Sequence, residues 1–179
     1  MRERRIHGRV WVLLDAAGKL IEDIDTDQIF HNAHLHITEL GQMGAFALGN
    51  LEGWTDFPKK AAAGDILVAG RNFGAGSSRQ QAVDCFIALG VAAILAPSFS
   101  AIYFRNAVNS GFPVLRGRGL EALIASGKLK AGDAVEADVA TGEARIVRGN
   151  VPLEIEPMSS VQLDIFRAGD LFAFGKGLA

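Results

Sequence analysis

The stretch "GRNFGAGSSRQQA", residues 70–82, brings two serines and an arginine together directly after two glycines. We expect Gly74 and Gly76 to support a site here, because a residue without a Cβ lets the backbone approach a ligand. An apolar helical pattern follows, and the helix is expected to begin at about Ser77 to Arg79. The free N–H groups and the dipole of a helix start favour an anion. Two hydroxyls and a guanidinium would add charge-assisted hydrogen bonds, so the stretch predicts an anion-binding site.

Other interpretations of this stretch are structural or belong to known nucleotide loops. The simplest is that Ser77 caps a helix while Arg79 points into solvent. A Walker A loop is excluded, because no Gly-Lys-Ser/Thr follows at the required spacing. A dinucleotide fingerprint is excluded as well, since the third glycine and an acidic residue at the end of the next strand are missing. A module that binds an anion without chemistry stays open as a separate class of function.

Strands and helices are expected to alternate around this stretch. Residues 65–70 and 91–96 are short apolar runs without polar alternation, which is typical of strands buried on both faces. Between them apolar residues recur at helical spacing, at Ala82, Cys85, Phe86 and Leu89. A strand, a helix and a second strand in this order predict a right-handed βαβ unit.

The rest of the chain continues the mixed pattern. The expected elements are a strand over 8–15, an acidic loop over 21–30, a weak helix over 39–50, a helix over 98–111, a strand over 112–115, a helix over 119–128, a hairpin over 133–149 and a last helix over 159–169. We therefore expect an α/β fold, a single domain over 1–179, with a central βαβ unit and peripheral hairpins.

Composition narrows the class of protein. The net charge of −2 argues against a nucleic-acid binder, which normally carries a basic surplus. No stretch reaches the roughly 20 apolar residues of a membrane helix. The apolar run near the N-terminus stops at Asp15, too early for a secretory signal, so we expect a cytoplasmic protein without membrane contact. Its one cysteine, Cys85, cannot by itself supply the thiolates of an iron–sulfur cluster or a Cys-type zinc site.

Three stretches carry a resemblance to a known family. They are "DTDQI" at 25–29, "GDILVAGRNFGAGSSRQQA" at 64–82 and "APSFSAIYFRNAVNSGFPVL" at 96–115. Together they resemble the small subunit of the aconitase-related hydro-lyases, which include isopropylmalate isomerase (3-isopropylmalate dehydratase) and homoaconitase. The resemblance runs along nearly the whole chain. It implies a swivelling β/β/α domain like the C-terminal domain of aconitase, inactive without a large subunit.

The resemblance also implies the chemistry and its residues. A [4Fe–4S] cluster on the large subunit would act as Lewis acid on a departing hydroxyl, and this chain would bind no cofactor itself. Ser77 would be the base, as an alkoxide, while Ser78 and Arg79 would bind a substrate carboxylate. Asp27 is expected to pair with Arg79 and orient it. An alkoxide is unstable in water, but a helix start, free backbone donors and a guanidinium could stabilise it in a dry cleft.

The segment after residue 29 is expected to choose the substrate. Homoaconitase-like members carry an arginine where this chain has His36, beside Leu35. An imidazole is a weaker, pH-dependent partner for an anion than a guanidinium. The two residues therefore favour a substrate with an alkyl branch, 3-isopropylmalate or 2-isopropylmalate of leucine biosynthesis. A homoaconitase or another dialkylmalate or methylmalate dehydratase small subunit is the alternative within the family.

Three histidines in this segment, His31, His34 and His36, allow a different hypothesis. With Asp27 or Glu39 nearby they could ligate a metal ion, as a metal-dependent enzyme would require. Clustered histidines in a polar loop more often face solvent or substrate. We expect no metal on this chain.

Overall fold

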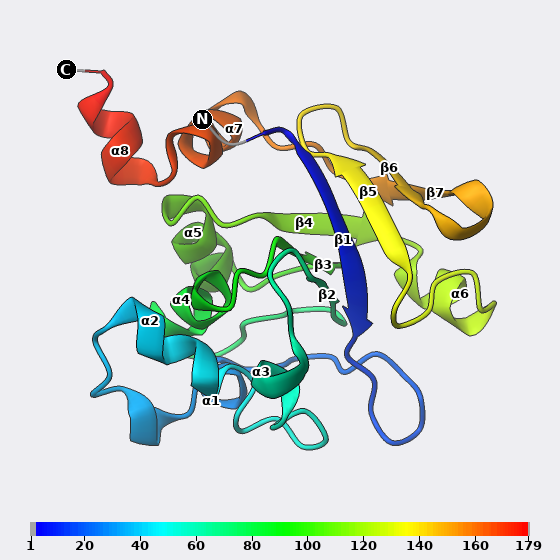
Figure 1. Ribbon diagram of the computed structural model, residues 1–179, viewed down its shortest axis with the longest axis horizontal. Coiled ribbons are helices and arrows are strands. Elements are labelled where there is room, and N and C mark those ends of the chain that lie inside the picture. Colours follow the sequence, from blue (N-terminus) through cyan, green and yellow to red (C-terminus); the bar gives the residue numbers. More distant parts are fainter. Residues whose placement is uncertain (1–2, 179) are drawn as a thin grey trace.

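Strands from both halves of the chain close into one barrel in the computed structural model, which describes residues 3–178 (Figure 1). Within that range the strands follow each other in the order β1-β2-β3-β4-β7-β6-β5, with β5 pairing back to β1. The strands are β1 (Arg5–Val12), β2 (Ile66–Val68), β3 (Ala93–Ala96), β4 (Val114–Arg118), β5 (Ala134–Asp138), β6 (Glu143–Ile146) and β7 (Val151–Ile155).

The helices are short and lie mainly outside the barrel (Figure 1). The α-helices are α1 (Thr26–Ile29), α2 (Leu40–Met43), α3 (Phe57–Lys60), α4 (Gln81–Ala88), α5 (Ala101–Asn109), α6 (Leu120–Ala125), α7 (Ser160–Ala168) and α8 (Leu171–Lys176). Single 3-10 turns form at Asn32–His34, Gly44–Phe46 and Arg148–Asn150.

Four neighbouring strands, β1 to β4, run parallel. Leu67 in the middle of β2 lies opposite Trp11 of β1 and Ile94 of β3. Helix α4 connects β2 to β3, so the predicted βαβ unit is confirmed. The expected α/β fold class is confirmed with it.

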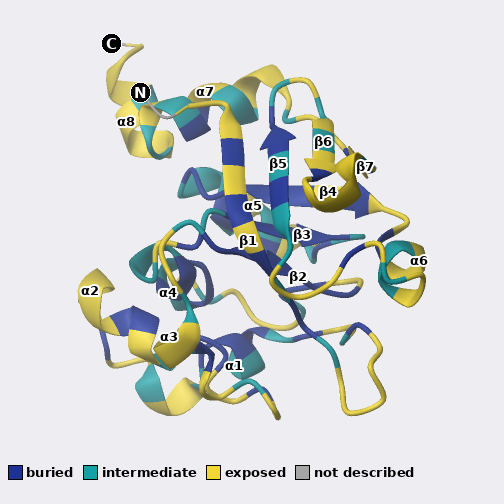
Figure 2. Cartoon of the chain, turned by 45° about the vertical axis from the view of Figure 1, so that its right-hand side comes forward, coloured by how far each residue is buried: buried dark blue, intermediate teal, exposed yellow. Residues whose placement is uncertain are grey.

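Alternating side chains of the parallel strands feed two separate apolar cores. Ile66 and Val68 of β2 point into the barrel, whereas Leu67 between them packs against the helices outside. Leu95 and Ile94 of β3 divide in the same way. Figure 2 shows β2 and β3 buried along their whole length, as expected for strands covered on both faces. Because one set of strands serves both cores, we infer that the chain is one domain.

The C-terminal third departs from the sequence expectation in detail. The hairpin over 133–149 forms as β5 and β6, but it closes the barrel instead of lying at the periphery. Neither β7 nor α8 was predicted. Pro152 interrupts the strand signal of β7, and α8 follows Gly169 as a short apolar run without a polar face.

Two helix starts also differ from the expectation. The supposed acidic loop contains α1, which begins after Asp25 through reciprocal hydrogen bonds between Asp25 and Gln28. Helix α4 begins at Gln81, so the prediction of a start at Ser77 to Arg79 was wrong. Residues 77–79 are instead held in a non-helical path by contacts to other loops.

Three loops meet at the carboxyl ends of the parallel strands. The chain reaches α1 after β1, residues 69–80 after β2, and α5 after β3. Backbone bridges join the loops, since Asp25 pairs with Ala75 and Phe73 pairs with Phe99. This edge of a parallel sheet is where ligands bind in open α/β folds.

Gly74 tests how tightly these loops are packed. It has φ of +79°, and a Cβ there would overlap the ring of Tyr103, a fully buried residue of α5. We expect Gly74→Ala to destabilise the protein by about 3 kcal/mol or more, because the left-handed backbone and the collision both cost energy. Urea unfolding followed by circular dichroism measures this.

Gly18→Ala is the matched control. Gly18 has φ of +76°, but nothing lies within 4 Å of a Cβ built on it. Its loss should be the backbone cost alone, about 1–2 kcal/mol. Equal losses for the two variants would contradict the packing argument.

Candidate functional site

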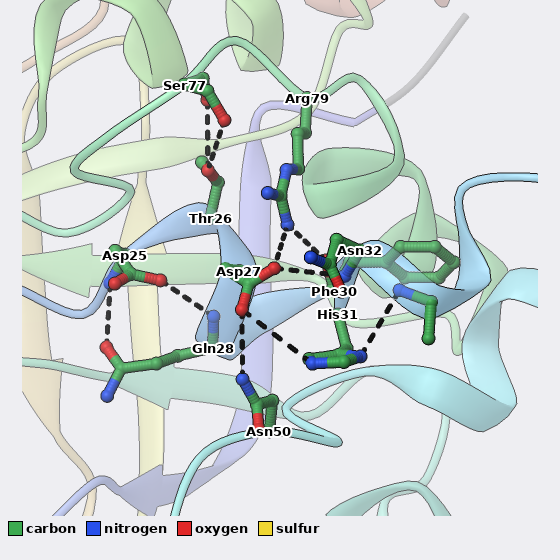
Figure 3. Close-up of polar contacts among 11 residues, drawn as sticks. Asp25, Thr26, Asp27, Gln28, Phe30, His31, Asn32, Asn50, Ser77 and Arg79 are labelled. Atoms are coloured by element: carbon green, nitrogen blue, oxygen red, sulfur yellow. Dashed lines mark hydrogen bonds and ion pairs between the residues drawn. The ribbon is translucent and has the colours of Figure 1, made fainter.

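Ser77 lies on an exposed loop and is tied to α1 by one buried hydroxyl. Thr26 Oγ1 donates to the Ser77 carbonyl oxygen at 3.0 Å and lies 3.4 Å from Ser77 Oγ (Figure 3). Thr26 is 3% exposed, whereas Ser77 is exposed. The candidate base is therefore held through its carbonyl oxygen, while the residue stays accessible to solvent.

Arg79 is held at one nitrogen and free at two others. Its Nη1 donates to Asp27 Oδ1 at 2.6 Å and to the Phe30 carbonyl oxygen at 3.0 Å. Its Nε and Nη2 have no acceptor among the described residues. Those two atoms form one edge of the guanidinium, the edge that binds a carboxylate by two parallel hydrogen bonds. The contact expected between Asp27 and Arg79 is present.

Asp27 collects donors from four sides. Besides Arg79, it accepts the Asn32 backbone N–H at 3.0 Å and the Asn50 side-chain amide at 3.1 Å, and His31 Nε2 lies 3.9 Å away (Figure 3). The hydrogen bond from Arg79 is the main cause that holds the pKa of Asp27 below its usual value. Asp27 is therefore ionised at neutral pH, as an orienting carboxylate must be.

Ser78 is held by a side chain of helix α5. Asn106 Nδ2 on α5 donates to Ser78 Oγ at 3.1 Å. An amide N–H occupies an acceptor position of the hydroxyl, which leaves the Ser78 O–H available to donate. Two residues further along the chain, Gln80 Nε2 donates to Ser110 Oγ at 2.8 Å.

Backbone N–H groups accumulate at the same place. Those of residues 77–81 donate to no other described residue. They supply the donors that we expected from a helix start, although α4 begins only at Gln81. The helix dipole weakens beyond the first turn, so its effect at Ser77 is smaller than predicted. Hydroxyls, N–H groups and a guanidinium edge are nevertheless gathered on one exposed segment.

Comparisons with known proteins place this arrangement in a family. A family model described as the aconitase C-terminal domain matches residues 53–116. A 3-isopropylmalate dehydratase small subunit from Pyrobaculum calidifontis is 39% identical over 88% of this chain and 93% of its own length. The crystal structure of a 3-isopropylmalate dehydratase from Methanocaldococcus jannaschii superposes with a TM-score of 0.83 at 32% identity, covering 97% of this chain and 95% of that one.

The chain belongs to the 3-isopropylmalate dehydratase small-subunit family. The resemblance seen in the sequence is thereby confirmed. A relative from Methanocaldococcus jannaschii carries another name, methanogen homoaconitase small subunit, and is 33% identical over 92% of this chain and 92% of its own length. Family membership therefore leaves room for more than one substrate.

The two residues expected to choose the substrate, Leu35 and His36, are exposed. Leu35 is 37% exposed, and His36 is exposed with Nδ1 at 3.1 Å from the Ala33 carbonyl oxygen. Among the described residues, no hydrogen bond or ion pair joins either of them to residues 77–79. Both remain specificity candidates, because an exposed side chain beside α1 can meet a ligand bound at the same edge.

The histidine segment forms no cluster suited to a metal. Within residues 3–178 no three His, Cys, Asp or Glu side chains gather as a metal site would require. His31 Nδ1 accepts the Ala33 backbone N–H, and the His34 ring lies 4.2 Å from the Phe46 ring. His31 therefore caps the turn at Asn32–His34, and the His34 ring packs on the ring of Phe46.

Cys85 belongs to the core of the family fold. Its side chain is fully buried on α4, and burial raises the pKa of the thiol far above its usual value. A buried neutral thiol does not ligate iron or act as a nucleophile.

Among the described residues, every helix is too short or too polar to span a lipid bilayer.

Thr26 was missed in the sequence, although a signal for its position was present. Asp25 and Gln28 have the spacing of a capping box, which predicts a helix start at Thr26. That start places the Thr26 and Asp27 side chains next to the motif loop. No local pattern indicates that Thr26 meets Ser77, since the two are 51 residues apart.

Asp27→Asn tests the electrostatic part of the site. We expect the variant to lose at most about 1 kcal/mol at pH 7, because the Asp27 side chain is 34% exposed and solvent screens the pair. The lowered pKa means that this stabilisation exists above the usual carboxyl pKa and disappears as the pH falls through the folded-state pKa. Urea unfolding at pH 7, 5 and 3 measures the difference.

The difference in stability between the two proteins should shrink toward pH 3 as the wild-type carboxyl takes up a proton. Glu52→Gln is the control, because Glu52 is exposed and has no hydrogen bond or ion pair to another described residue. A wild-type to Asp27→Asn difference that does not change with pH would contradict an ionised Asp27.

Proposed function

We propose that this chain is the small subunit of a hydro-lyase that isomerises 3-isopropylmalate and 2-isopropylmalate, and that it is active only with a large subunit. The observation that carries the proposal is the Ser77-Ser78-Arg79 segment: each residue is held by another element, Ser77 and Ser78 are exposed, and Arg79 keeps two guanidinium nitrogens without an acceptor among the described residues. The family names support this function. A cytoplasmic, leucine-biosynthetic role accompanies it.

The segment can bind one carboxylate of a malate-type acid. The free Nε and Nη2 of Arg79 match the two oxygens of a carboxylate, and the Ser78 O–H can donate to one of them. Such a clamp places the carbon next to that carboxylate beside Ser77 Oγ. Holding reacting groups at contact distance removes much of the entropic barrier to the reaction.

Ser77 then takes the proton from that carbon. The C–H bond breaks, an Oγ–H bond forms, and the electron pair enters a carbon–carbon double bond while the hydroxyl on the neighbouring carbon leaves. In the reverse step hydroxide adds to the carbon that lost its proton, and Ser77 returns its proton to the carbon that lost its hydroxyl, so the isomerisation is proton-neutral. The backbone N–H groups of residues 77–81 donate to no other described residue, and in the proposed reaction they would be candidate donors to negative charge near Ser77.

The residues of this chain do not fit an iron–sulfur cluster. A cluster needs several thiolates, and the one cysteine is buried and neutral. We assign the [4Fe–4S] cluster, which supplies the Lewis acid for the departing hydroxyl, to the large subunit. The exposure of Ser77 and Ser78 fits a site that a second protein completes.

A module that binds an anion without chemistry is the competing function. Both functions need Arg79, but only the hydro-lyase needs the Ser77 hydroxyl. We expect Ser77→Ala, assembled with its large subunit, to lose kcat by about 100- to 10,000-fold with little change in KM, since a general base contributes that much. Steady-state kinetics and size-exclusion chromatography measure activity and assembly.

Ser126→Ala is the matched control, because Ser126 Oγ only donates to the Leu123 carbonyl oxygen on α6. It should keep wild-type kinetics. The chain purified alone should show no dehydratase activity. Near-normal turnover of assembled Ser77→Ala would overturn the assignment of the base, and normal binding with no turnover by the wild-type complex would favour the anion-binding module.

His36→Arg tests the proposed preference for an alkyl branch. A guanidinium at this exposed position should favour a substrate with a distal carboxylate, raising kcat/KM for homoaconitate relative to 3-isopropylmalate by about tenfold. His7→Arg on β1 adds the same charge away from the motif and should leave the ratio unchanged. A ratio unaffected by His36→Arg would remove this residue from substrate choice.

A further inference from the structure

We infer that Thr26 is a positioning residue for the base: its buried hydroxyl fixes Ser77 and switches to donate to Ser77 Oγ when that oxygen is ionised. The inference rests on the proposed function of Ser77. It concerns a hydroxyl that neither the motif nor the substrate clamp includes. Two observations and one chemical argument support it.

The first is the geometry of the two hydroxyls. Thr26 Oγ1 lies 3.0 Å from the Ser77 carbonyl oxygen and 3.4 Å from Ser77 Oγ, so one hydroxyl faces both oxygens of the same residue (Figure 3). A hydroxyl has one proton and turns freely about its C–O bond. It can therefore change acceptor by turning about that bond, and a small approach of the two oxygens from 3.4 Å completes the hydrogen bond to the alkoxide.

The second observation is burial. Thr26 is 3% exposed, and its backbone N–H donates to the Ala75 carbonyl oxygen at 2.9 Å. Its side chain is held by the N-terminus of α1, whose first turn is fixed by the Asp25–Gln28 capping box. A donor that is shielded from water and already oriented stabilises a charge at little reorganisation cost.

The chemical argument concerns which of the two hydroxyls donates when Ser77 is neutral and when it is ionised. When Ser77 is neutral, its O–H can donate to Thr26 Oγ1 while Thr26 donates to the Ser77 carbonyl oxygen. When Ser77 is an alkoxide it has no proton to donate, and the Thr26 O–H can turn to Ser77 Oγ. A hydrogen bond to the charged form lowers the pKa of a group. Thr26 would therefore raise the fraction of Ser77 that is ionised before substrate arrives.

Thr26→Val in the assembled enzyme tests this, because valine keeps the shape and removes the hydroxyl. We expect kcat to fall by about 10- to 100-fold, the range of one hydrogen bond to a charged group, with KM changed less than about threefold. The rising limb of kcat against pH should move to higher pH. Thr26→Ser keeps a hydroxyl and should restore most of the activity.

An isotope effect separates positioning from a merely structural role. With substrate deuterated at the carbon that loses its proton, Thr26→Val should show a larger isotope effect on kcat than wild type, since proton removal becomes slower. A variant that only lowers the fraction of folded enzyme leaves the isotope effect unchanged. Thr141→Val, in the turn between β5 and β6, is the matched loss of a threonine hydroxyl and should behave as wild type.

The outcomes distinguish this inference from the proposed function. If Ser77→Ala is inactive while Thr26→Val has wild-type kcat, pH profile and isotope effect, the role of Thr26 is wrong and the base assignment stands. If Ser77→Ala is active, the proposed function fails first. Should Thr26→Val not fold, Thr26→Ala measured against Thr26→Ser gives the same comparison, and equal kinetics for those two would overturn the inference.

Discussion

The ion pair between Asp27 and Arg79 is the contact on which the site depends. It joins two loops that are 52 residues apart in the chain, at 2.6 Å. It fixes Nη1 of the guanidinium, while Nε and Nη2 keep no acceptor among the described residues. The pair also explains why residues 77–79 do not continue α4 toward its N-terminus: the strand order brings α1 beside this loop, and Arg79 is directed to Asp27 and the Phe30 carbonyl.

Each motif residue is anchored while some of its hydrogen-bonding atoms stay unpaired among the described residues. Thr26 reaches Ser77, Asn106 reaches Ser78, and Asp27 reaches Arg79, so two elements from different strand ends hold three consecutive residues. The anchors occupy the carbonyl oxygen, an acceptor position of one hydroxyl and one guanidinium nitrogen. A loop fixed in this way avoids an entropic cost when substrate binds, because its side chains are ordered beforehand.

The fold was predictable where apolar periodicity decides the outcome. The strands around α4 and its buried face at Ala82 and Cys85 follow from sequence spacing alone. Strand β7 was not predictable, because Pro152 opposes it locally and pairing with β4 and β6 decides it. The motif itself was found, and so was its acidic partner Asp27. The remaining anchors could not be found, since hydroxyl and amide contacts over long sequence separations leave no periodic signal.

The exposure of Ser77 has a consequence for where the chemistry can occur. In water a serine hydroxyl is a very weak base, and in the isolated chain water competes for its oxygen and for the free N–H groups of residues 77–81. Charge stabilisation by oriented donors becomes large only where water is excluded. On the proposed function, this chain would supply donors near Ser77, among them the hydroxyl of buried Thr26. The surface that excludes water would then come from the large subunit, and assembly of the two subunits would be the step that activates the proposed base.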